Sequence, residues 1–182
     1  EQDPGLRARA ERGEICFGNI NTWILWKLTG GREHLTDSAN AGRTLLFDVR
    51  KNQWDDALME KMGIPPQMLP EVRPCDARFG LAVEPREAFQ KPLPVMASIG
   101  DQMSALFGQT CFRRGEAKCT IGTCLNLVTY TGRYEPPANG ILPAIAANRS
   151  GELTYELEGG VYVAGSINEW LTDPLGIADS PK

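Results

Sequence analysis

Residues 98–132 read SIGDQMSALFGQTCFRRGEAKCTIGTCLNLVTYTG, and this stretch decides the fold. It continues from an apolar run, Leu93 to Ile99, whose composition is typical of a buried strand and which stops at Gly100. Three apolar residues then recur at helical spacing: Met103, Leu106 and Phe107. The pattern predicts a strand, a glycine and a helix in succession. Asp101 therefore lies where a strand ends and a helix begins, which is where ligands bind in open α/β sheets.

A hairpin is predicted a few residues further on. Residues 116–121 and 124–130 each alternate between two sets of side chains with the period of a β-strand. Gly122 and Thr123 separate the two runs, so we expect a tight turn in which glycine supplies positive φ. Such a turn presents backbone N–H groups and the Thr123 hydroxyl to a ligand, and phosphate suits these donors.

Together the carboxylate and the turn suggest phosphoryl transfer. Asp101 would accept the proton of an attacking hydroxyl, and the 122–123 turn would hold the phosphates of the donor. The residues by themselves favour simpler roles. Aspartate before an apolar-periodic run is a common helix N-cap, and Gly-Thr is common in ordinary hairpins.

Several motifs, in the same order, resemble those of the FGGY family of carbohydrate kinases. GDQxxALFGQ begins at Gly100, GxAKxTxGT begins at Gly115, and TG occupies residues 131–132. Upstream, between residues 21 and 74, the matching segments are NTWILWKLTGG, TDSANAGRTLLFD, WDD and IPPQMLPEVRP. The resemblance extends over nearly the whole chain and is greatest to members that phosphorylate glycerol.

The resemblance implies an α/β fold of mixed sheets with flanking helices, of the actin-like, ribonuclease H-like ATPase type. Members of the family have two such domains with the active site in the cleft between them. Residues 1–95 would be the C-terminal part of the first, substrate-side domain, and residues 96–182 the N-terminal part of the second, nucleotide-side domain. We therefore expect a fragment of a larger enzyme that is inactive alone.

The resemblance also implies a role for five residues. Asp101 would be the general base and Gln102 its neighbour in the polyol site. Gly122 and Thr123 would form the nucleotide-phosphate turn, and Gly165 would lie beside the nucleotide. The implied reaction transfers phosphate from ATP, with Mg²⁺ bound to the nucleotide, to a polyol or sugar hydroxyl, glycerol foremost. A homo-oligomer of the full-length protein is compatible with the family.

Four residues depart from the family pattern. Cys124 replaces a glycine of the turn, and Asn126 replaces an aromatic residue that lines the polyol pocket. Glu169 replaces a neutral glutamine, and Asn21 replaces an aspartate. These changes leave two alternatives open: a kinase for another small sugar or polyol, and a truncated or degenerate kinase-like domain without catalysis.

The composition excludes several other classes. The chain has 182 residues, of which 42% are hydrophobic and 23% charged, as in ordinary globular proteins. The net charge is −4 with scattered lysines and arginines, which argues against nucleic-acid binding. No apolar run approaches a membrane span and no signal-peptide pattern opens the chain, so we expect no membrane partner and a cytoplasmic location.

Cysteine and histidine spacing gives no metal site. The five cysteines form no CxxC pair, and their odd number favours free, mostly buried thiols. His34 is the only histidine, and its polar surroundings predict a solvated side chain.

The remaining pattern predicts short elements. Helices are expected at 4–13, 15–28 and 54–62, and from Trp170 after a capping box of Ser166 and Glu169. Strands are expected at 32–36, 141–147, 153–157 and 161–164, with a polar turn at 37–40, irregular chain at 65–94 and a loop at 134–140.

Two pairs of residues in these helices have competing interpretations. Trp23 and Trp26 could stack on a sugar, but their helical spacing favours core positions. Asp55 and Asp56 fall in a first helical turn, where acidic groups favour the helix dipole, so we interpret them as structural and not as paired catalytic carboxylates.

Overall fold

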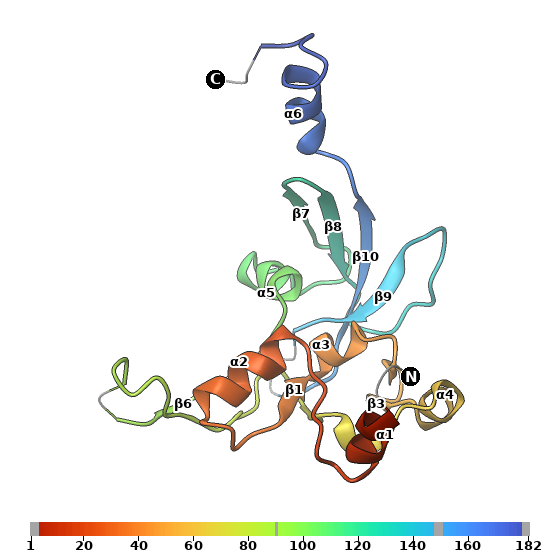
Figure 1. Ribbon diagram of the computed structural model, residues 1–182. Helices are drawn as coiled ribbons and strands as arrows, with labels where there is room; N and C mark the ends of the chain where they lie inside the picture. Colours follow the sequence, from red (N-terminus) through yellow and green to blue (C-terminus); the bar gives the residue numbers. More distant parts are fainter. Residues whose placement is uncertain (1–3, 90, 148–150, 180–182) are drawn as a thin grey trace. The chain divides into compact units, whose positions relative to one another are not determined.

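The computed structural model describes residues 4–89, 91–147 and 151–179 and contains two compact units (Figure 1). Unit 1 comprises Glu1–Asp101 and Ala147–Leu153, and unit 2 comprises Gln102–Ala146 and Thr154–Lys182. The helices are α1 (Pro4–Glu11), α2 (Ile20–Leu28), α3 (Ser38–Gly42), α4 (Asp56–Met62), the 3₁₀ helix η1 (Pro66–Met68), α5 (Asp101–Gly108) and α6 (Ser166–Thr172).

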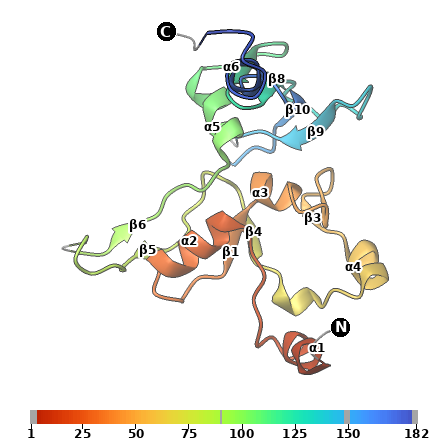
Figure 2. The same cartoon turned by 45° about the horizontal axis from the view of Figure 1, so that its top comes forward.

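Unit 1 is built from small two-stranded sheets. Parallel strands β1 (Leu35–Asp37) and β4 (Glu71–Arg73) lie side by side, with α2 next to them (Figure 2). Two antiparallel pairs complete the unit: β2 (Phe47–Asp48) with β3 (Gln53–Trp54), and β5 (Leu81–Ala82) with β6 (Leu93–Pro94). A small apolar core forms where Leu25, Leu35 and Phe79 meet. The short strands agree with the irregular character expected for residues 65–94.

Unit 2 contains one antiparallel sheet of four strands in the order β7-β8-β10-β9 (Figure 1). These strands are β7 (Ala117–Ile121), β8 (Leu125–Tyr130), β9 (Leu142–Ile145) and β10 (Tyr155–Val161). Helix α5 packs on this sheet through Leu106, which shares a buried cluster with Cys111 and Val128. The predicted hairpin at 117–130 is confirmed by the pairing of β7 with β8.

The buried strand expected at residues 93–99 does not form. Only Leu93 and Pro94 are in a strand, and the Leu93 side chain is 43% exposed. Val95 packs against the unit 1 core, but Met96 is 56% exposed. An apolar run predicts burial, but a strand also needs a neighbouring strand to pair with. Here the run pairs with β5, which has only two residues.

The strand predicted at 153–157 continues as far as Val161, and residues 162–164 of the next predicted strand are not in a strand. Residues 155–161 form the continuous strand β10, which passes through Gly159 and Gly160 and pairs with both β8 and β9. Glycines in sequence predict a break between strands, but the strand runs through both of them. Neither has positive φ, and a Cβ on Gly160 would lie only 3.2 Å from the Leu125 carbonyl oxygen, so glycine serves close strand packing there.

Helix α2 begins at Ile20, five residues later than predicted, and its apolar stripe is exposed. Ile20, Trp23 and Ile24 are 76%, 58% and 49% exposed, and Thr22 and Leu25 are the buried positions. The core interpretation of Trp23 is therefore wrong in this chain. Lys27 lies over the Trp23 ring, with Nζ 5.0 Å from its centroid.

Cysteine burial also differs from expectation. All five cysteines are free, as predicted, but only Cys75 and Cys111 are buried. The other three, Cys16, Cys119 and Cys124, are exposed. No helix among the described residues is both long enough and apolar enough to traverse a bilayer.

Candidate functional site

The turn between β7 and β8 spans three residues, 122–124, because Ile121 pairs with Leu125. The Gly122 N–H donates to the Cys124 carbonyl at 2.9 Å and closes the loop. Gly122 does not adopt positive φ, so that prediction is wrong, and Cys124 is likewise outside the left-handed region. The loop is one residue longer than the turn that was assumed, and it closes without a left-handed residue.

Segment 164–166 is bonded directly to this turn. The Ala164 N–H donates to the Thr123 carbonyl at 2.9 Å, and the Gly165 N–H donates to the Gly122 carbonyl at 2.8 Å. A Cβ atom on Gly165 would lie 2.5 Å from the Gly122 oxygen, which is too close for any other residue without a backbone shift. The structure therefore brings Gly122 and Thr123 together with Gly165, which lies about 40 positions further along the chain.

Ser166 takes part in this contact and not in a capping box. Its Oγ donates to the Thr123 carbonyl at 3.2 Å. The N-cap of α6 is Gly165, with no side-chain cap bond, so the predicted pairing of Ser166 with Glu169 is absent. Glu169 is exposed in the first turn of α6. The capping box does not form because the Ser166 hydroxyl bonds instead to the Thr123 carbonyl in the β7–β8 turn.

The turn keeps donors available at its tip. Both carbonyls of Gly122 and Thr123 accept hydrogen bonds from segment 164–166. Thr123 is exposed, and its hydroxyl and N–H have no acceptor among the residues that the structure describes. Exposed N–H and O–H donors on a rigid turn are suited to an anion such as a phosphate group.

Asp101 and Gln102 occupy the first turn of α5. Asp101 is its first residue and is exposed, so its carboxylate is accessible to solvent. The Gln102 side chain is held by strand β7: its Oε1 accepts from Lys118 Nζ and, at 3.4 Å, from Thr120 Oγ1. Lys118 Nζ also donates to Thr120 Oγ1 at 2.8 Å. Gln102 is thereby linked to the strand that leads into the 122–124 turn.

Lys118 was missed by the sequence analysis. The lysine is 2% exposed, whereas the apolar residue Ile121 on the other face of β7 is 73% exposed. Alternation identifies two faces of a strand, but it does not say which face the helix covers. The only available signal was a lysine within a motif of the FGGY resemblance.

Asn126 lies on the same sheet face as Thr120, its direct partner across the β7–β8 pair. Its Nδ2 donates to Glu158 Oε1 at 2.7 Å, and its Oδ1 is buried without a hydrogen-bond donor among the described residues. The sheet face is therefore polar where Thr120 and Asn126 lie side by side.

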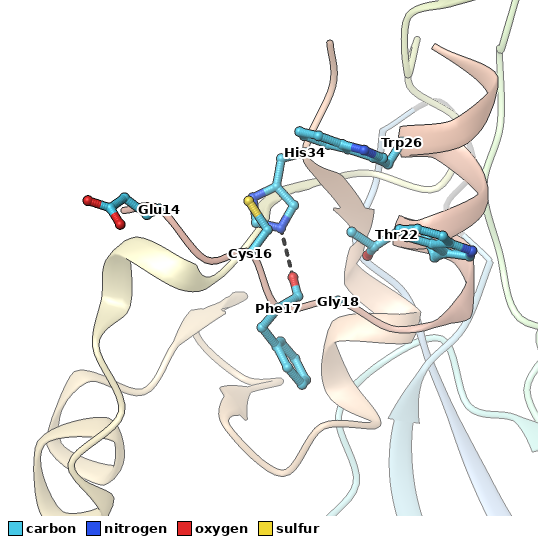
Figure 3. Close-up of a pocket in the computed structure, with 8 residues that line it drawn as sticks. Glu14, Cys16, Phe17, Gly18, Thr22, Trp26 and His34 are labelled. Carbon is cyan, nitrogen blue, oxygen red and sulfur yellow. Dashed lines mark hydrogen bonds between the residues drawn. The ribbon is translucent and has the colours of Figure 1, made fainter. Parts of the chain in front are cut away.

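A separate pocket of about 560 Å³ lies in unit 1 beside α2 (Figure 3). Its lining includes Trp26, with the His34 ring edge-on to it at 6.3 Å between centroids. His34 is half-buried, and its Nε2 lies 2.7 Å from the Phe17 carbonyl oxygen, so the solvated side chain that was expected is not observed. The other lining residues are Glu14, Cys16, Phe17, Gly18, Thr22 and Trp23. None of the five predicted site residues lies in this pocket.

The polar turn predicted at 37–40 is the junction of β1 and α3. Asp37 is fully buried and caps α3, since Oδ1 accepts from the Asn40 N–H at 2.9 Å. Its Oδ2 accepts from Asn21 Nδ2 at 3.0 Å and from Ser98 Oγ at 2.9 Å. Burial raises the pKa of Asp37 above its ordinary value of 3.8, and the hydrogen bonds from Asn40 and Ser98 oppose this effect. The network ties the segment before Asp101 to unit 1.

Residues that could hold a metal ion do not cluster in the described part of the chain. No group of three or more histidine, cysteine, aspartate or glutamate side chains is close enough together there.

Comparison with known proteins identifies relatives of this chain. Residues 1–108 match the N-terminal domain of the FGGY family of carbohydrate kinases. A glycerol kinase of Polaromonas naphthalenivorans is 48% identical over 172 residues, covering 94% of this chain and 34% of that protein. A glycerol kinase of Carboxydothermus hydrogenoformans is 44% identical over 177 residues, covering 97% of this chain and 35% of that protein. The chain spans about a third of the length of these relatives.

Solved structures show the same fold. A crystal structure of Plasmodium falciparum glycerol kinase with ADP superimposes with a TM-score of 0.88 at 36% identity, over 97% of this chain and 36% of that one. A xylulose kinase from Brucella ovis gives a TM-score of 0.77 at 20% identity, over 95% of this chain and 37% of that one. The partial, mixed α/β fold of the actin-like ATPase type is thus confirmed.

Proposed function

This chain belongs to the FGGY family of carbohydrate kinases, and we propose that the full-length protein carrying it phosphorylates glycerol to glycerol 3-phosphate with ATP. The substrate follows from the glycerol kinases of 48% and 44% identity that align with 94% and 97% of the chain.

The observation that carries the proposal is the contact between the 122–124 turn and Gly165. The missing Cβ of Gly165 lets two backbone hydrogen bonds form to the turn, at 2.8 and 2.9 Å, and these hold its tip in one conformation. A preorganised turn with exposed N–H and hydroxyl donors supports a role in binding nucleotide phosphates. The related Plasmodium falciparum glycerol kinase was crystallised with ADP.

Each predicted residue has a role in this proposal. Mg²⁺–ATP supplies the phosphoryl group and neutralises its charge when bound. Asp101 accepts the proton of the attacking hydroxyl, for which an exposed carboxylate at the start of α5 is suited. Gln102 binds the polyol, Gly122 and Thr123 bind the nucleotide phosphates, and Gly165 lies beside the nucleotide. The rate gain comes mainly from positioning and charge stabilisation.

The proposal includes the domain assignment. Residues 1–95 belong to the substrate-side domain and residues 96–182 to the nucleotide-side domain. The 182 residues alone do not catalyse phosphoryl transfer. We place the enzyme in the cytoplasm, where ATP is available.

A second candidate is a kinase-like domain that has lost catalysis. Cys124 favours it, because its Sγ lies 3.0 Å from the Tyr162 carbonyl oxygen and adds a side chain to the phosphate turn. Such a domain would neither bind Mg²⁺–ATP tightly nor phosphorylate glycerol in the full-length protein.

The test is the substitution Asp101→Asn in the full-length protein. We expect kcat for glycerol to fall by a factor of about 100 or more, because the general base is removed. The KM for ATP should stay within about twofold, since Asp101 does not bind the nucleotide in this scheme. Asp56→Asn, at an exposed position of α4, is the matched control and should leave kcat unchanged. An undiminished rate in Asp101→Asn would contradict the proposed base.

A further inference from the structure

Lys118 is the only lysine or arginine that is buried in the described part of the chain. Its side chain projects from β7 towards α5 and is 2% exposed. The acceptors of its ammonium group are both neutral: Gln102 Oε1 and Thr120 Oγ1. No carboxylate among the described residues forms an ion pair with it.

This arrangement is unfavourable for stability alone. A buried charge is normally paired with an opposite charge, because neutral partners compensate only part of the lost hydration. Protein sites that keep such a charge are often functional ones. A methionine of similar length would fill the same space without the desolvation penalty, so the lysine has a use beyond packing.

The charge determines how the Gln102 amide is oriented. An ammonium group has three donors and no acceptor, so only the carbonyl oxygen of the amide can face it. Thr120 Oγ1 accepts from Lys118 and can therefore give its own proton to the same Gln102 oxygen, at 3.4 Å. Both contacts favour one of the two amide orientations, and the Nε2 group points away from Lys118.

We propose that Lys118 is a positioning residue that holds the Gln102 carbonyl, so that Gln102 offers its N–H₂ group to a polyol hydroxyl. This inference rests on the proposed function, in which Gln102 binds the polyol. A substrate hydroxyl that donates its proton to a carboxylate base can still accept a hydrogen bond on its oxygen. A fixed amide N–H₂ group can donate that hydrogen bond. An unanchored amide would spend part of its time in the opposite orientation, with an acceptor facing the substrate.

The same contact connects two parts of the proposed site. Lys118 and Thr120 lie on β7, and β7 continues directly into the turn at Gly122. Gln102 and the phosphate turn are therefore anchored to one strand within unit 2. When the polyol-binding and phosphate-binding groups are fixed to one strand, less conformational entropy must be lost to reach the reactive geometry.

The experiment uses four forms of the full-length protein: wild type, Lys118→Met, Gln102→Ala and the double variant. Lys118→Met should raise the KM for glycerol by about tenfold, which is the typical effect of losing one charge-assisted hydrogen bond. The KM for ATP should stay within about twofold. If Lys118 acts through Gln102, the double variant should be no worse than Gln102→Ala.

Two further variants keep the test decisive. Thr120→Val keeps the lysine but removes the hydroxyl, so it should raise the glycerol KM in the same direction and replaces Lys118→Met should that variant not fold. Lys91→Met, at an exposed loop position, is the control and should leave both KM values unchanged. Additive losses in the double variant, or an unchanged glycerol KM in Lys118→Met, overturn the inference.

Wild-type turnover separates this inference from the proposed function. A wild type that does not phosphorylate glycerol overturns the proposed function, whatever the variants do. The anchor itself is then tested by ¹⁵N spectra of the Gln102 side chain. We expect Lys118→Met to shift the Gln102 N–H₂ signals towards those of a mobile glutamine, and unshifted signals overturn the anchor.

Discussion

A Cβ atom at position 165 would lie 2.5 Å from the carbonyl oxygen of Gly122. The candidate phosphate turn therefore requires glycine at this position. Real Cβ atoms do not approach backbone that closely, so any side chain at 165 must push α6 away from the turn. The consequence is local, because the affected hydrogen bonds are those from Ala164 and Gly165 to the turn carbonyls.

Gly165→Ala is therefore expected to weaken both folding and nucleotide binding. The clash should lower the free energy of unfolding by about 1–3 kcal/mol. The affinity of the full-length protein for Mg²⁺–ATP, measured by calorimetry, should fall about tenfold or more. Gly108→Ala is the matched control: its Cβ meets nothing within 4 Å and its φ is not positive, so it should be neutral or slightly stabilising. Equal effects of the two variants would contradict this role for Gly165.

The buried Asp37 carboxyl predicts a pH dependence of stability. Because burial raises its pKa in the folded chain above 3.8, the folded state holds the proton more tightly than the unfolded state does. Its contribution to the free energy of unfolding therefore falls as pH rises from about 3.8 through the folded pKa.

The check is urea unfolding of wild type and Asp37→Asn across this range. The asparagine does not titrate, and its oxygen can still accept from the Asn40 N–H. The free energy of unfolding of wild type minus that of the variant should decrease with rising pH and then level off. A difference that increases with pH would show that the hydrogen bonds, and not burial, dominate the pKa of Asp37.

At the level of elements, helix α4 shows the best agreement between sequence and structure. Asp55 is its N-cap, with Oδ1 accepting from the Leu58 N–H at 3.0 Å, and Gly63 ends it with φ of 66°. Both signals are local, which explains why the helix and its end at Gly63 could be predicted, although it begins at Asp56 and not at Trp54. The structural interpretation of Asp55 and Asp56 is consistent with these contacts.

The two adjacent aspartates should differ in their effect on stability. Asp55→Ala removes the cap bond and should lower the free energy of unfolding by about 1 kcal/mol. Asp56→Ala affects only the interaction with the helix dipole and should cost a few tenths of a kcal/mol. Chemical denaturation of both variants checks this, and a larger loss for Asp56→Ala would contradict the assignment of Asp55 as the cap.

The β7–β8 hairpin shows where element prediction stops. Alternation at 117–121 and 125–130 was enough to predict two paired strands, since the period of side chains is a property of the strand alone. It was not enough to predict that Lys118 is buried while Ile121 is exposed. That outcome depends on α5 covering the Lys118 face, and α5 is a separate element.

For the whole molecule, the relevant fact is that the chain spans 34–35% of its glycerol kinase relatives. Each unit exposes large apolar side chains, such as Trp23 at 58% in unit 1 and Tyr162 at 90% in unit 2. Exposed apolar groups of this size commonly contact other parts of a larger protein. In the proposed function, the turn and the start of α5 would supply only some of the groups that bind nucleotide and polyol.

The isolated 182-residue chain is therefore expected to bind Mg²⁺–ATP weakly and to phosphorylate no glycerol. Calorimetric titration should show no saturable binding in the micromolar range, because the chain spans only about a third of the length of its relatives. The full-length protein is the positive control. Clear micromolar binding by the 182 residues would contradict this prediction.

The sequence by itself determined the features that depend on near neighbours: helix α4 with its end at Gly63, the hairpin of β7 and β8, and the motifs that resemble the FGGY family. Only the tertiary structure decided which strand face is buried and that Gly165 touches Gly122. It also decided that Ser166 bonds to Thr123 in place of capping α6, and that residues 93–99 lack the strand expected there. The physical reason is the same each time. Local signals act through adjacent backbone, whereas burial and close approach depend on which distant segment packs alongside.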